Sequence, residues 1–265
     1  MKKLCKLMTI LGLLLIIPAA AAAHTLWINA TDFTPKFRPK FGAASKTLFG
    51  YGHRYPLADF LKEDHLAKFQ LVKGEKITDL KPNPGGFLAT AVKFKEAGAY
   101  IISAALNPGY YTMNMEKGRP SHHLKPMTGL DNVFLSLYYE QYTKALINVG
   151  ETTDDAFAQV LGDKMEIIPQ QNPYNLKPGD TLKIKVLLNG KAARFCWVHA
   201  TYAGFSNVDD FAFATKTDAK GIAEVRILHH GNQLIKVDKK LPASGEYVGK
   251  CIEEHYTATI TFDIK

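Results

Sequence analysis

The sequence is short of cysteine and of long hydrophobic runs, and both shortages restrict the class of protein. Only three cysteines occur among 265 residues, which excludes a disulfide-rich scaffold. The one long apolar run, Met8 to Ile17, is interrupted only by Thr9 and Gly12. It is shorter than the roughly 20 residues that a membrane-spanning helix needs. No dense cluster of lysine and arginine occurs either, so the sequence does not indicate nucleic-acid binding.

Motifs of common enzyme classes are also missing. There is no G-x-S-x-G, no H-E-x-x-H and no phosphate-binding loop. Asp154-Asp155, Asp209-Asp210 and Glu253-Glu254 are neighbours in sequence, so on extended backbone their side chains diverge. They are typical of solvated turns and linkers, and we expect the protein not to be an enzyme. A histidine-rich tract and a C-x-x-C motif are absent too.

What the sequence does contain begins with an export signal at residues 1–23. Lys2, Lys3 and Lys6 precede the apolar run, Pro18 ends it, and Ala21 and Ala23 form an A-x-A cleavage site. We therefore expect a periplasmic or secreted protein that does not span a membrane after cleavage. Removal of the signal leaves 30 basic and 25 acidic residues, a net charge of +5.

Cys196 and Cys251 are the two cysteines that remain after cleavage. In an oxidising compartment an even pair indicates a disulfide. The sequence therefore predicts a Cys196–Cys251 bond, with two buried free thiols as the alternative.

Short apolar segments separated by glycine and proline turns predict an all-β protein of two β-sandwich domains. The N-terminal sandwich would cover residues 24–150, with a long irregular loop at 107–131. Residues 151–163 would be a linker, and residues 164–265 an immunoglobulin-like sandwich. The clearest alternation lies in Thr181 to Leu188 and in His255 to Ile264.

Histidines are the candidate metal ligands. Cleavage after Ala23 would make His24 the first residue, whose α-amine and imidazole can chelate one transition metal. His53 lies in a loop next to Gly52 and is the second candidate. His122 and His123 are the third, although adjacent residues point in opposite directions, so we expect only one of them to bind.

Several segments resemble an exported family of domains of unknown function, which is described as the periplasmic component of nickel/cobalt uptake systems of the ABC type. The segments that carry the resemblance are Ala23-His24-x-x-Trp27, Gly52-His53, Tyr142 to Ala145, Met165 to Pro169, Leu176 to Asp180, Val186 to Lys191 and Ala200 to Tyr202. The resemblance implies a divalent transition metal, nickel or cobalt, and a membrane metal-uptake transporter as partner.

Three hypotheses follow. The first is an exported protein that captures or delivers nickel or cobalt, with copper or zinc as other metals that imidazole favours. The second is a non-enzymatic β-sandwich module that binds a protein or glycan through Tyr110 and Tyr111. The third is a copper oxidase in which an N-terminal histidine and a second histidine bind copper on a β-sandwich.

Overall fold

The computed structural model describes residues 24–56, 59–153 and 156–265. The predicted signal at 1–23 lies outside the described residues. Within them, the regular elements are strands and short 3-10 helices, and the all-β class is confirmed. None of the described helices is long and apolar enough to cross a membrane.

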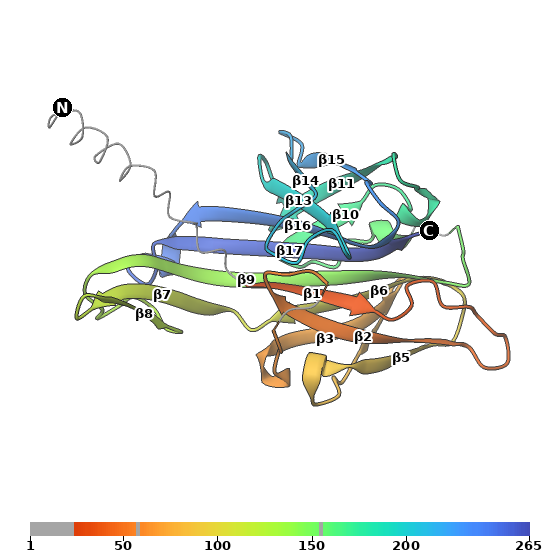
Figure 1. Cartoon of the computed structure of the whole chain (residues 1–265), viewed down its shortest axis with the longest axis horizontal. Coiled ribbons are helices and arrows are strands. Elements are labelled where there is room, and N and C mark those ends of the chain that lie inside the picture. The colour runs from red at the N-terminus through yellow and green to blue at the C-terminus, as the bar shows by residue number, and fades with distance from the viewer. Residues whose placement is uncertain (1–23, 57–58, 154–155) are drawn as a thin grey trace, which may run out of the picture.

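The strands of the described chain form three sheets (Figure 1). The three-stranded sheet has the order β1 (Thr25–Ala30), β2 (Ala43–Gly52) and β5 (Thr90–Phe94). The four-stranded sheet contains β10 (Met165–Pro169), β11 (Thr181–Leu188), β12 (Lys191–Ala192) and β15 (Ile222–Arg226). The ten-stranded sheet contains β3 (Leu66–Lys73), β4 (Lys76–Asp79), β6 (Gly98–Leu106), β7 (Gly109–Glu116), β8 (Arg119–His123), β9 (Val133–Val149), β13 (Trp197–Tyr202), β14 (Phe213–Lys216), β16 (Gly231–Pro242) and β17 (Glu253–Ile264). The 3-10 helices are Glu63–His65, Gly86–Leu88, Ala156–Ala158, Pro173–Asn175 and Gly245–Tyr247.

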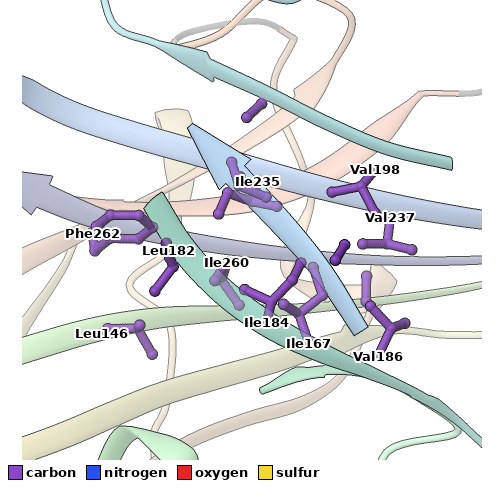
Figure 2. Close-up of a cluster of buried hydrophobic side chains, with 14 of the residues drawn as sticks. Leu146, Ile167, Leu182, Ile184, Val186, Val198, Ile235, Val237, Ile260 and Phe262 are labelled. Atoms are coloured by element: carbon purple, nitrogen blue, oxygen red, sulfur yellow. The ribbon is translucent and has the colours of Figure 1, made fainter. Parts of the chain in front are cut away.

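The two small sheets cover opposite faces of the large one. Successive residues of a strand point to opposite faces, and β6 shows this: Ala99 and Ile101 belong to one buried cluster, Tyr100 and Ile102 to the other. The first cluster includes Ile167, Ile184 and other residues of the four-stranded sheet (Figure 2). The second includes residues of β1, β2 and β5. The chain therefore has two apolar cores separated by one sheet.

Strand β9 holds the large sheet together. It is 17 residues long and pairs with β6 over its second half and with β7 over its first. Its other edge pairs in parallel with β17, from Glu253 opposite Leu137 onward. Strands from both sides of the predicted boundary at 151–163 thus belong to the same sheet.

The prediction of an irregular loop at 107–131 is wrong, because most of this segment is a β-hairpin. Strands β7 and β8 pair from Thr112 opposite His123 to Glu116 opposite Arg119. Lys117 and Gly118 both have positive φ, which suits the tight turn between them. The prolines, glycines and methionines of the segment suggested a loop, although its side chains alternate between two faces. Pairing of β7 with β9 stabilises this extended conformation.

The predicted Cys196–Cys251 disulfide is also wrong in this structure, where both cysteines are free and buried. Trp197, next to Cys196, aligns with Asp238 and through it with Thr257. Cys251 precedes the start of β17 at Glu253, which is already about 13 Å along the strand from Thr257. A disulfide needs Cα atoms about 4.4–6.8 Å apart, so the register prevents the bond.

Gly50 of β2 leaves room for the Trp27 side chain of β1. Trp27 is opposite Gly50 in the pairing of the two strands, and its buried indole lies over the glycine. A Cβ atom at position 50 would come within 2.1 Å of the indole Nε1. The residue is therefore glycine because the indole occupies the space of any side chain.

We predict that Gly50→Ala destabilises the protein by about 1–3 kcal/mol, the usual cost of overpacking a core. Chemical denaturation of Gly50→Ala, Trp27→Leu and the double variant measures it. The two effects should be less than additive, because removal of the indole relieves the clash. Strictly additive losses would contradict the proposed contact.

Candidate functional site

The structure brings His24 and His53 together. Their ring centroids are 4.7 Å apart, with the ring planes at 82°. His24 immediately precedes β1, and His53 immediately follows β2. Because Thr25 pairs with Gly52 in this antiparallel pair, the two histidines lie at the same end of the two strands. The ring of Tyr51 lies 5.0 Å from that of His24.

The start of β1 is fixed by side chains of the large sheet. The Gln141 amide donates to the carbonyl of His24 at 2.6 Å and accepts from the Leu26 backbone N–H at 2.8 Å. Thr259 Oγ1 donates to the Leu26 carbonyl at 2.8 Å. Gln141 and Thr259 are both almost fully buried. The backbone on each side of Thr25 is therefore held in place, and the position of the His24 side chain with it.

The loop that carries His53 is anchored over β1. The carbonyl of Pro56, which follows a cis peptide bond, accepts from Trp27 Nε1 at 3.0 Å and from Asn29 Nδ2 at 2.7 Å. Tyr55 is buried, and its hydroxyl donates to the Gln233 carbonyl on β16 at 3.4 Å. Both ends of the segment from Gly52 to Pro56 are therefore fixed.

One nitrogen of each imidazole faces a carboxylate. His24 Nε2 lies 3.9 Å from Asp59 Oδ2, and His53 Nδ1 lies 3.3 Å from Asp209 Oδ2. Asp209 comes from the segment between β13 and β14, far from His53 in sequence. A carboxylate beside one ring nitrogen orients the ring and increases the basicity of the other nitrogen. Within the part of the chain that the structure describes, Nδ1 of His24 and Nε2 of His53 have no carboxylate partner.

Electrostatics favour a neutral His24. Burial lowers the pKa of its imidazole, the neighbouring His53 lowers it further, and Asp59 opposes both effects. Burial, together with the nearby Tyr139, raises the pKa of Tyr51 to about 12. At neutral pH the His24 ring therefore has a lone pair free for a metal, and Tyr51 stays a neutral phenol.

His122 and His123 do not join this pair. They lie on β8, where His123 is opposite Thr112, which in turn is opposite Ser136 of β9. Gln141, which contacts His24, is five residues further along β9, or about 17 Å. The four histidines predicted as ligands therefore occupy two separate places.

The side chains of His24 and His53 alone supply too few ligands to hold a metal ion. Within the described residues, no group of three or more histidine, cysteine, aspartate or glutamate side chains is placed to hold a metal ion. Two imidazole nitrogens are present, and the α-amine of His24 would be the third if the chain began there. The site fits a transition metal on that condition.

Sequence reasoning missed the residues that support the two histidines. Asp209 was assigned to a solvated turn because its neighbour is Asp210, and Asp59 and Gln141 were not singled out. No local pattern marks them, because Asp59 and Gln141 lie 35 and 117 positions from His24, and Asp209 lies 156 positions from His53. The glycines around His53 were the one local signal of a constrained loop.

A second polar group lies on the same face of the sheet, next to His53. His199 Nδ1 is 3.7 Å from Asp238 Oδ1, and both this nitrogen and Nε2 of His255 are buried with no hydrogen-bond partner among the described residues. Beside the candidate site is a cavity of about 20 Å³, enough for about one water molecule. Its lining includes His53, Asp209 and Lys236.

We predict that His255 makes the protein sensitive to acid. Its pKa is lowered from 6.5 to about 4, mainly by burial; Asp238 opposes this shift, and Lys240 and Lys236 add to it. A lowered folded-state pKa means that the unfolded chain binds the proton more readily. The stabilisation is therefore complete above pH 6.5 and is lost as the pH falls toward 4, by up to roughly 3 kcal/mol.

Urea denaturation of the wild type and of His255→Gln between pH 7 and pH 4 measures this effect. The variant should show a flatter dependence of unfolding free energy on pH. His65→Gln is the matched control, since the His65 side chain is 55% exposed. Equal slopes for His255→Gln and the wild type would refute the assignment.

Comparison with known proteins assigns the chain to a family but does not indicate its function. Residues 21–240 match the family described as "Domain of unknown function (DUF4198)". No curated protein matches the sequence. Among solved structures, the chain is similar to the D0-D1 domain of intimin, with 14% identity, a TM-score of 0.23, and 90% of this chain and 97% of that chain covered. It is also similar to fibronectin(III)-like modules of CbhA from Clostridium thermocellum, with 12% identity, a TM-score of 0.21, and 91% and 95% covered. At such TM-scores neither structure informs the function.

Proposed function

Because the chain belongs to the DUF4198 family, whose description names no activity, we propose its function from the geometry of His24 and His53. The protein is an exported metal-binding protein that captures a late first-row divalent metal, nickel or cobalt, and delivers it to a membrane uptake transporter. The observation that carries this proposal is the approach of the two imidazole rings to 4.7 Å between centroids.

The proposal needs export, because cleavage after Ala23 creates the third nitrogen. An N-terminal His24 would bind through its α-amine and Nδ1, which together close a chelate ring. Asp59 is beside Nε2 of the same ring, the nitrogen that the chelate does not use. His53 would contribute Nε2, because its Nδ1 faces Asp209. Both carboxylates thus support the nitrogens that bind rather than compete with them.

The choice of metal rests on the ligands and on the sequence resemblance. Imidazole and amine nitrogen suit nickel, copper and zinc, and affinity for a given nitrogen site is highest for Cu²⁺. Nickel or cobalt is proposed because the segments around His24, His53 and Met165 to Asp180 resemble a family described as part of nickel/cobalt uptake. The same three nitrogens would also suit copper, so the affinity for each metal has to be compared.

We predict that the chain starting at His24 binds one Ni²⁺ or Co²⁺ and that one extra N-terminal residue weakens binding. Isothermal titration of the two chains, one starting at His24 and one at Ala23, measures the difference. The extra residue turns the amine into an amide, so the chelate is lost while both imidazoles remain. We expect a loss of about 100-fold or more, or about 2.7 kcal/mol.

Cu²⁺ and Zn²⁺ titrated in parallel give the selectivity, and His24→Ala and His53→Ala remove each imidazole. Equal affinity in the two chains would overturn the chelate. Equal affinity in His53→Ala and the wild type would overturn the paired site. Intact mass of the secreted protein shows whether the chain starts at His24.

We further predict that Asp209→Asn lowers metal affinity by about 10- to 100-fold, the usual cost of losing a partner of a metal-binding histidine. Asp210→Asn is the matched control, because Asp210 accepts from the Ser206 hydroxyl at 3.3 Å and pairs with no histidine among the described residues. The two variants have the same charge change and neighbouring positions. If both weaken binding equally, the effect is one of general charge and not of the contact with His53.

A further inference from the structure

The β7–β8 hairpin carries a second set of potential metal ligands, on one of its faces. Met113 and Met115 alternate on β7, so both point to the same side. His122 of β8 is directly opposite Met113, and Pro120 is opposite Met115. Directly opposed residues have Cβ atoms about 4.5–5.5 Å apart, and diagonal neighbours such as Met115 and His122 about 7–8 Å, within reach of long side chains.

The two histidines of β8 have different surroundings. His123 points to the other face, where its Nε2 lies 3.1 Å from both Asn114 Oδ1 and Glu116 Oε1. His122 makes no hydrogen bond or ion pair within the described chain, and its ring is stacked on Tyr111 with a centroid distance of 6.1 Å. His122 therefore has both ring nitrogens free, and Tyr111 restricts its orientation.

These side chains are also accessible. His122 is exposed and Met115 is 39% exposed, while Met113 is half-buried. Packing alone does not explain methionine on this exposed strand, because leucine would cover the same apolar surface. Two thioethers and an unpaired imidazole on one face form a set of soft and borderline ligands, with no carboxylate among them.

We propose that Met113, Met115 and His122 form a separate site that binds Cu(I). Thioether sulfur selects Cu(I) over the harder divalent metals, and imidazole is a common third ligand of copper. The site differs in chemistry from the three nitrogens at His24 and His53, which suit divalent ions. Met113 aligns with Leu135, six residues or about 20 Å along β9 from Gln141, so the two sites can be tested independently.

Anaerobic competition with bicinchoninate, a chelator that is coloured when it holds Cu(I), tests the proposal on the chain starting at His24. We expect one Cu(I) to be withdrawn from the chelator. The double variant Met113→Leu with Met115→Leu should lose affinity by about tenfold or more. These substitutions preserve side-chain volume and apolarity, so the fold should be unaffected. X-ray absorption at the copper edge should show sulfur neighbours in the wild type and none in the double variant.

Matched controls separate this site from other ligands. Met127→Leu removes a methionine outside the hairpin, His123→Gln removes the histidine of the other face, and His24→Ala disables the divalent site. All three should keep the wild-type Cu(I) affinity, whereas His122→Phe should lose it. The proposal is overturned if the double methionine variant binds Cu(I) as the wild type does. It is equally overturned if no Cu(I) is withdrawn, or if the loss follows His24 or His123 instead of His122.

Discussion

The structure depends on how the free edge of β1 is hydrogen-bonded. One edge of this strand pairs with β2, and the other faces the ten-stranded sheet. There its backbone groups bond to side chains: Gln141 bonds to the His24 carbonyl and the Leu26 N–H, Thr259 donates to the Leu26 carbonyl, and Thr261 to that of Ile28. An unpaired buried backbone group costs about 1–3 kcal/mol, so these side chains make it possible to bury β1 without a second strand partner.

This arrangement decides where the candidate ligands lie. Because β1 is held across β9 and β17, its first residue meets the loop that follows β2, and His24 meets His53. The same placement brings Asp209, from the C-terminal part of the chain, beside His53. A site made from three distant segments is rigid only if all three are held by the large sheet. The Tyr55–Gln233 and Trp27–Pro56 hydrogen bonds provide that support for the loop of His53.

The two groups of histidines illustrate how one fold separates two chemistries. At His24 and His53, the imidazole nitrogens are flanked by carboxylates, which would support the divalent cation of the proposed function through the rings. On the hairpin, His122 is beside thioethers and has no carboxylate partner in the described ranges of the chain, while His123 on the other face has one in Glu116. The alternation of the strand thus assigns adjacent histidines to different environments.

The sequence alone determined the all-β class, because the alternation in Thr181–Leu188 and in His255 to Ile264 is a local pattern. It also named His24 and His53 as candidates from residue type and position. It did not reveal the hairpin at 107–131, whose strands are stabilised by β9, nor the separation of Cys196 from Cys251, which the register of β13, β16 and β17 imposes. It could not show the approach of His24 to His53, or their carboxylates. Only the tertiary structure decided these points, because strand pairing joins residues far apart in the chain and no local pattern encodes the register.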